Sequence, residues 1–164
     1  MNRLTYYIIL RYSDKLAPPP GTIKLHEEVI KKHGSVWLGK FGRRISDQVV
    51  DRMKNQIKAK KPTYIFLTQA LGKQKFMIHA GLLENIERKI DEQDLIPQYY
   101  HDRSDRISTW FRISRFMKLS PKVLTVLIGR SSGVPIFRTF SQTVAAMLLV
   151  SLKQDEKLED YLVD

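Results

Sequence analysis

The chain contains no cysteine, which excludes structural disulfides and zinc sites built on thiolates. It also has no long hydrophobic run, because the longest apolar stretch, residues 144–150, is far too short to span a bilayer. Residues 1–16 hold one short apolar patch that Arg11 and Asp14 interrupt, which is not the pattern of a signal peptide. These absences predict a soluble cytoplasmic protein. Its 164 residues are enough to bury a core without cross-links.

Recognisable catalytic motifs are missing as well. No serine lies in a Gly-x-Ser-x-Gly elbow, and no glycine-rich phosphate loop precedes a helix. His26 and His33 are seven residues apart in one predicted helix, whereas helical metal ligands usually sit three or four apart. We therefore expect both to be half-exposed, His79 to be structural and His101 to lie in a polar loop. The sequence predicts a chain that is not an enzyme and has no metal and no cofactor.

Acidic residues are scarce compared with basic ones. The chain has 17 Asp and Glu against 28 Lys and Arg, for a net charge of +11. Residues 31–61 hold ten basic residues and two acidic ones, and residues 103–138 hold eight and one. Residues 84–102 and 153–164 are instead net acidic. A basic surface also serves solubility, but a surplus of this size makes polyanions the first partners to consider.

Aromatic residues lie within or beside the basic segments. Aromatic faces stack on nucleobases while Lys and Arg neutralise phosphates, so the combination favours nucleic-acid binding over catalysis. Most of these rings are still expected to serve the core. The residues are Trp37, Phe41, Tyr99, Tyr100, Trp110 and Phe111.

Strand and helix patterns alternate along the chain and predict a mixed α/β fold with five or six strands. Two strands joined by a short turn at residues 71–74 argue against a purely parallel sheet. We expect one domain over residues 1–152, followed by an acidic tail over residues 153–164. The predicted strands are 5–12, 35–41, 63–69, 75–83, 108–116 and an extended stretch at 134–140; the predicted helices are 22–33, 46–61, 120–128 and 141–152.

The order of several segments matches a known family. Gly34-Ser-Val-Trp-Leu-Gly-Lys-Phe-Gly42 follows the helix that carries His26, and the strand patterns at 63–68 and 75–81 come next. Thr109-Trp-Phe-Arg-Ile113 and the loop at 129–142 complete the series. Over residues 5–150 this order resembles EVE-type members of the PUA-like superfamily, to which YTH domains are related. One departure is Leu38, where the EVE pattern often has a second aromatic residue.

The resemblance implies a curved, barrel-like sheet flanked by helices and a non-catalytic reader of nucleic acids, often of modified bases. The base enters an aromatic pocket, which in duplex DNA requires flipping it out of the stack. The chain also resembles the N-terminal recognition domain of McrB-type modification-dependent restriction systems. There the reader is joined to a GTP-hydrolysing motor that works with a nuclease, and the acidic tail is expected to begin a linker to such a motor.

The resemblance also implies roles for single residues. Trp37 is the expected pocket wall, and Trp110 is a second candidate wall that can equally belong to the core. The base-pocket candidates are Trp37, Leu38, Gly39, Lys40, Trp110, Ser132 and Arg138. The backbone-contact candidates are Arg43, Arg44, Lys54, Lys58, Lys61, Arg112, Arg115 and Arg130.

Four hypotheses stay open from the sequence. A reader of methylated bases in DNA ranks first, and an RNA-binding PUA-like module ranks second. A small enzyme with an unrecognised site and a basic structural adaptor follow. The base modification and the oligomeric state are not determined by the sequence.

Overall fold

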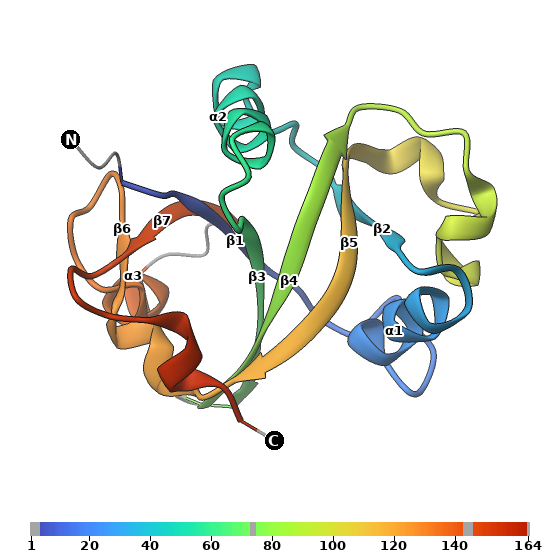
Figure 1. The fold of residues 1–164 in the computed structure, drawn as a ribbon. Coiled ribbons are helices and arrows are strands. Elements are labelled where there is room, and N and C mark those ends of the chain that lie inside the picture. Colours follow the sequence, from blue (N-terminus) through green and yellow to red (C-terminus); the bar gives the residue numbers. More distant parts are fainter. Residues whose placement is uncertain (1–3, 73–74, 143–145, 164) are drawn as a thin grey trace. The chain divides into compact units, whose positions relative to one another are not determined.

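The computed structural model describes residues 4–72, 75–142 and 146–163, which form two compact units (Figure 1). The first unit comprises the described residues up to Tyr12, Tyr64–Gly81 and the chain from Met117 onward. The second unit comprises Ser13–Thr63 and Leu82–Phe116. The chain therefore leaves the first unit and returns to it twice, and each unit is described by itself below.

The second unit begins with two helices whose ends are set by local capping. Helix α1, Thr22–His33, has Gly21 at its N-cap, and the Asp14 carboxylate accepts a hydrogen bond from the Thr22 backbone N–H at 2.9 Å. Thr22 is thus the first helical residue, as the predicted bounds had it, and Gly34 ends the helix in the left-handed conformation. Helix α2, Asp47–Lys58, starts at Ser46, whose side chain accepts from the Val49 N–H.

Strand β2, Val36–Phe41, pairs antiparallel with strand β5, Ile107–Leu119, within the second unit. The register places Trp37 opposite Arg112 and Gly39 opposite Trp110. Residues directly opposite each other in an antiparallel pair project to the same face. Both tryptophans therefore lie on one face of this two-stranded ribbon.

The connection between strand β4, Lys75–Glu87, and strand β5 contains three 3-10 turns. These turns are Gln93–Leu95, Gln98–Tyr100 and Ser104–Arg106. This connection carries buried apolar residues such as Ile96 and Tyr100.

The first unit is built around strand β1, Tyr7–Arg11. It pairs parallel with strand β3, Tyr64–Gly72, and antiparallel with strand β7, Met147–Leu152. Strand β6, Leu127–Gly129, extends the sheet from β7, and helix α3, Ile136–Gln142, lies between them in sequence. The core of this unit includes Ile9, Phe66, Leu127, Ile136 and Val150.

The hydrogen-bonding order of the strands is β2-β5-β4-β3-β1-β7-β6. The mixed α/β class is confirmed, with parallel and antiparallel neighbours in an open sheet flanked by three helices. The sheet has seven strands in the described chain, so the prediction of five or six strands was wrong. Strands β6 and β7 account for the difference.

The last third of the chain departs from the predicted elements. The predicted helix at 120–128 is a 3-10 turn, Pro121–Thr125, followed by β6, because Leu127 and Gly129 pair with Leu152 and Val150 of β7. The stretch expected to be extended at 134–140 forms α3 instead. The predicted helix at 141–152 is wrong over residues 147–152, which are hydrogen-bonded to β1 on one side and β6 on the other. Its residues 143–145 lie outside the described chain.

The acidic segment at the C-terminus is attached to the first unit. Leu158 is buried in the first unit's core, within a 3-10 turn, Leu158–Tyr161. The Ser120 N–H donates to the Tyr161 carbonyl at 2.7 Å, and Leu162 forms a β-bridge with Leu119. A domain boundary at residue 152 and a linker function for this segment stay predictions.

Candidate nucleic-acid interface

The candidate site of the second unit is an aromatic cluster on the ribbon of β2 and β5. Its buried members are Trp37, Ile96, Tyr100, Ile107 and Trp110, and Phe41, Ile90, Leu95 and Tyr99 pack against them. Trp37, Tyr100 and Trp110 are only 2%, 2% and 3% exposed. The two tryptophans proposed as pocket walls are thus brought together, in a cluster that their neighbours close off from solvent.

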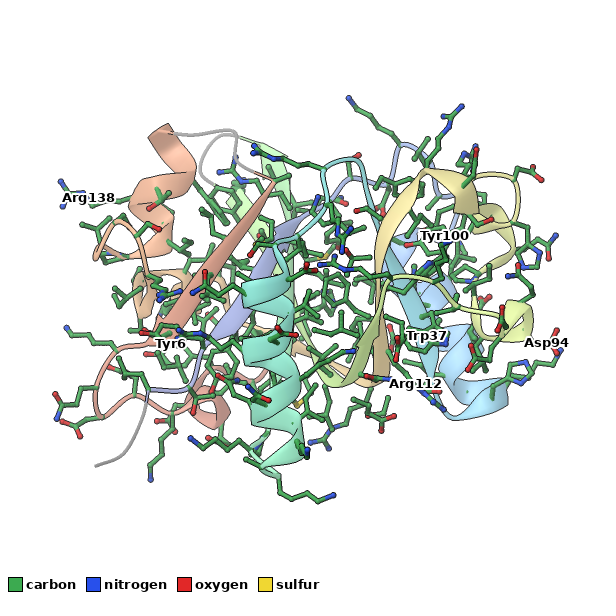
Figure 2. All side chains as sticks on the ribbon, turned by 90° about the horizontal axis from the view of Figure 1, so that it is seen from above. Tyr6, Trp37, Asp94, Tyr100, Arg112 and Arg138 are labelled. Carbon is green, nitrogen blue, oxygen red and sulfur yellow. The ribbon has the colours of Figure 1, made fainter. Side chains whose placement is uncertain are left out.

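Tyr100, labelled in Figure 2, contacts four other rings of this cluster and its surroundings. Its ring centroid lies 5.9 Å from Trp110, 5.6 Å from Phe41 and 4.7 Å from Tyr99. The fourth ring around it is His26 of α1, at 5.3 Å. Three of these contacts are edge-to-face, the arrangement that aromatic quadrupoles favour.

His26 is fully buried, which corrects the expectation that it is half-exposed. Its Nδ1 lies 2.7 Å from the Thr22 carbonyl oxygen. Because a carbonyl can only accept, Nδ1 carries the hydrogen and Nε2 presents a lone pair. Burial lowers the pKa of His26 to about 4, although the hydrogen bond to Thr22 opposes this shift. His26 is therefore neutral at physiological pH, whereas His33 on the same helix is exposed.

Two polar atoms in and around the cluster are buried without a hydrogen bond. Among the described residues, neither the Trp37 Nε1 nor the His26 Nε2 has a partner. The Trp37 Nε1 is an N–H donor, and the His26 Nε2 is an acceptor through its lone pair. Buried polar groups are normally satisfied, so each such exception calls for an explanation.

The residues after Trp37 have separate roles in the structure. Leu38 points to the other face of the ribbon and is buried there opposite Phe111. The Gly39 N–H donates to the Tyr100 hydroxyl at 3.4 Å, and a Cβ at Gly39 would lie 2.5 Å from the Ile107 Cδ1. Glycine at this position therefore permits close packing against Ile107.

Lys40 does not point freely into solvent. Its ammonium group donates to the Arg43 carbonyl at 2.7 Å and to the Phe41 carbonyl at 3.3 Å. Burial lowers the pKa of Lys40, with a smaller contribution from the charge of Arg43. These bonds hold the basic turn that follows β2.

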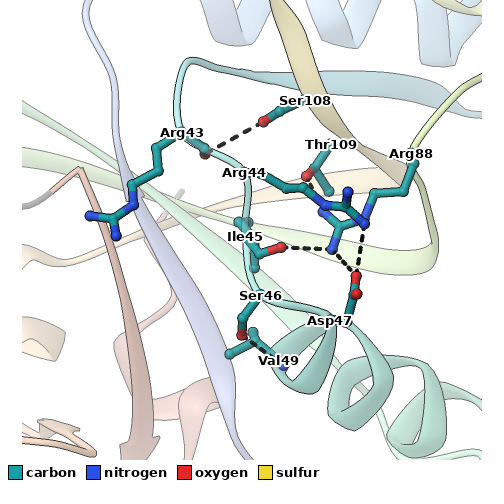
Figure 3. A network of polar contacts seen from close by, with 9 residues as sticks. All are labelled: Arg43, Arg44, Ile45, Ser46, Asp47, Val49, Arg88, Ser108 and Thr109. Carbon is teal, nitrogen blue, oxygen red and sulfur yellow. Dashed lines mark hydrogen bonds and ion pairs between the residues drawn. The ribbon is translucent and has the colours of Figure 1, made fainter.

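A network around Arg88 holds the same turn from the other side (Figure 3). The Arg88 guanidinium donates to the Thr109 hydroxyl at 2.7 Å, to the Ile45 carbonyl at 2.6 Å and to the Asp47 carboxylate at 2.7 Å. Asp47 also pairs with Arg44 at 3.0 Å. Hydrogen bonds from Arg88 and then Arg44 lower the pKa of Asp47. Arg88 was not among the predicted site residues.

The other backbone-contact candidates of the second unit are distributed over its surface. Arg43, Lys58, Lys61 and Arg115 are exposed, and Lys54 is half-buried on α2. Lys61 lies beyond the end of α2 at Lys58, so the helix is shorter than predicted.

Arg112 is the candidate that lies beside the aromatic cluster. Its guanidinium is 6.0 Å from the Trp37 ring centroid, and its Nε donates to the Ser35 hydroxyl at 3.0 Å. A Glu84 carboxylate oxygen lies 3.8 Å from the same nitrogen. Figure 2 shows Trp37 and Arg112 near each other on the second unit.

The remaining three candidates belong to the first unit and are exposed. The Arg130 guanidinium lies 5.4 Å from the ring centroid of Tyr6, and the Ser132 hydroxyl accepts from the Val134 N–H. Arg138 lies on α3. Because Trp37 and Trp110 belong to the second unit, no single unit contains all the predicted pocket residues.

In the described part of the chain, no group of three or more His, Cys, Asp or Glu residues could hold a metal ion. No helix among the described residues is both long and apolar enough to cross a membrane.

The fold and the site define a mixed α/β module that contains a closed aromatic cluster and is rich in basic residues. The model of the PUA-like family matches residues 8–126, which is most of the chain, and the chain therefore belongs to the PUA-like family. No curated protein and no solved structure matches it. PUA-like domains bind nucleic acids and are generally non-catalytic binding modules.

Proposed function

We propose that this protein reads a methylated base in DNA by accepting the flipped base among the rings of the aromatic cluster. In this proposal it serves as the specificity domain of an McrB-type restriction complex, together with a GTPase motor and a nuclease. The observation that carries the proposal is the pair of buried, unpaired polar atoms, Trp37 Nε1 and His26 Nε2, at a cluster of aromatic rings.

The chemistry of these two atoms suits the edge of a nucleobase. An indole N–H donates to a ring nitrogen or an exocyclic oxygen, and a neutral imidazole nitrogen accepts from an exocyclic amine. Aromatic rings supply stacking, which for a single base is worth about 1–3 kcal/mol. Ile96 and Ile107 add apolar surface of the kind that favours a methyl group.

The basic residues of the second unit suit the phosphate backbone. Residues 31–61 hold ten of them, including Arg43 and Arg44 in the turn after β2 and Arg52, Lys54 and Lys58 on α2. Phosphate contacts position a protein on a duplex, whereas contacts with the base provide selectivity. Flipping a base out of a duplex costs a few kcal/mol, which the stacking and hydrogen bonds in the cluster offset.

A binding comparison tests the proposal directly. Affinity is measured at one salt concentration for duplexes with methylated cytosine, with methylated adenine or with no modification, and for matched RNA. We expect one methylated duplex to bind more tightly than the unmodified one. Trp37→Phe keeps a ring but removes the N–H donor, so it should reduce this discrimination more than it reduces general affinity.

Other outcomes of this comparison identify the alternatives. A clear preference for RNA would indicate an RNA-binding PUA-like module. Equal, weak binding to every ligand would leave only an electrostatic surface. An equal loss of affinity for all ligands in Trp37→Phe would contradict the role of Trp37.

The lysines of α2 provide a second test. Lys54→Gln and Lys58→Gln together should lower the affinity for modified and unmodified duplexes alike, because phosphate contacts are independent of sequence. The slope of log K against log salt should decrease in magnitude by about 2, since each phosphate contact contributes roughly 1. Lys15→Gln, an exposed lysine outside α2, is the matched control. An unchanged slope in the double variant would place the backbone contacts elsewhere.

A further inference from the structure

We propose that Tyr100 occupies the ring site in the free protein and that a ligand ring takes its place. This inference rests on the proposed function and adds how the site is regulated. The ring of Tyr100 is surrounded by His26, Phe41, Tyr99 and Trp110, with centroid separations of 4.7–5.9 Å. Such a set of rings is what a planar, uncharged ligand requires, and here a side chain of the protein fills it.

The hydrogen bond to the Tyr100 hydroxyl indicates which polar group a ligand ring would need in the same place. It accepts a hydrogen bond from the Gly39 N–H at 3.4 Å, well beyond the usual 2.9–3.0 Å of such bonds. A weak bond is exchanged at little cost, and a carbonyl oxygen or ring nitrogen on a base could accept from the same N–H. Burial also raises the pKa of Tyr100, so the occupant is neutral, as a nucleobase is.

Three of the rings that surround Tyr100 lie on a helix and on strands, whereas Tyr100 itself lies in a short turn. His26 is on α1, Phe41 on β2 and Trp110 on β5, all of them regular elements. Tyr100 instead ends a three-residue 3-10 turn, Gln98–Tyr100, in the long connection between β4 and β5. Tyr99 shares this turn, so a ligand that replaces Tyr100 would be bounded by the rings of His26, Phe41 and Trp110. The turn can therefore rearrange without breaking the pairing of β2 with β5.

The segment just before Tyr100 carries three exposed carboxylates, on Asp91, Glu92 and Asp94. Residues 84–102 are net acidic, whereas residues 31–61 are strongly basic. Figure 2 shows Asp94 of this connection at the outer side of the second unit.

The direction in which Tyr100→Leu changes DNA affinity distinguishes a displaceable Tyr100 from one that only packs in the core. Tyr100→Leu removes the occupant ring and lowers stability in either case. If a minor open state is populated at about 10% or less, removing the occupant raises the affinity for the methylated duplex about tenfold or more. The affinity for the unmodified duplex should not change. A purely structural Tyr100 predicts lower affinity for both duplexes.

A matched control and a second measurement make the test complete. Phe111→Leu removes a fully buried ring of β5 from the other face of the ribbon, so it should lower stability without raising affinity.

In the unaltered protein labelled with 3-fluorotyrosine, the Tyr100 resonance is assigned by its loss in Tyr100→Phe. We expect this ¹⁹F resonance to shift on addition of the methylated duplex and to stay in place with the unmodified one.

The outcomes distinguish the two proposals. A protein that discriminates the methylated duplex while its Tyr100 resonance does not move overturns the displacement of Tyr100 and leaves the proposed function intact. If Tyr100→Leu also binds the methylated duplex more weakly, Tyr100 is a structural wall. A protein that shows no discrimination at all overturns the proposed function and this inference together.

Discussion

Replacing Arg88 with leucine is expected to lower the free energy of unfolding by about 3 kcal/mol. The substitution removes the donors of three hydrogen bonds and leaves the buried Thr109 hydroxyl and the Ile45 carbonyl without that partner. A buried acceptor left unsatisfied costs about 1–3 kcal/mol. Urea denaturation followed by tryptophan fluorescence measures the change as a shift of the midpoint.

The matched control for this prediction is Arg44→Leu. Arg44 and Asp47 form an ion pair whose side chains are 62% and 74% exposed, and exposed pairs contribute little to stability. The control should therefore leave the midpoint almost unchanged. Equal losses in the two variants would show that the ion pair with Asp47, rather than the bonds to Ile45 and Thr109, carries the stability.

Acidification from pH 6.5 to pH 4 is expected to cost roughly 3 kcal/mol of stability through His26 alone. Burial lowers its pKa from 6.5 to about 4 in the folded state. Between these two values the unfolded chain binds a proton that the folded chain does not, so stability falls as the pH falls. The contribution is fully present above pH 6.5 and is lost by about pH 4.

The difference between the protein and His26→Phe isolates this effect from that of the carboxylates. Unfolding free energies of both proteins are measured across the range, and their difference should change by the stated amount. The neighbouring Tyr99 and Tyr100 do not titrate there, because burial raises the pKa of both. His33→Gln, on the exposed side of the same helix, should show the pH dependence of the unaltered protein. A constant difference between the protein and His26→Phe would mean that His26 is protonated or solvated when folded.

The elements that sequence predicts well are those with strong local signals. Both α1 and α2 follow from an apolar stripe together with a stop or start residue, Gly34 for the first and Ser46 for the second. In the C-terminal third the same kinds of signal misled, because Ser120 and Pro121 start a 3-10 turn rather than a helix. The run at Met147–Leu152 is apolar at every position except Ser151, and such a run cannot be distinguished from a buried helix by periodicity.

The site was predicted in part for a similar reason. Trp37 and Trp110 could be assigned to strands, but their position on one face depends on a register between segments far apart in the chain. The burial of His26 had a local signal, since it follows Ile23 by three positions and precedes Ile30 by four on the apolar face of α1. Arg88 had none, because its partners lie 21, 41 and 43 residues away.

The closed aromatic cluster has a kinetic consequence. A ring site that is already filled admits a ligand only in the fraction of molecules whose occupant has left, and the apparent affinity is reduced by that fraction. If Tyr100 fills the ring site as proposed, the rate at which a base enters cannot exceed the rate at which the turn at Gln98–Tyr100 departs. Under the proposed function, phosphate contacts would then form before any base is bound, and the two steps would be separate in time.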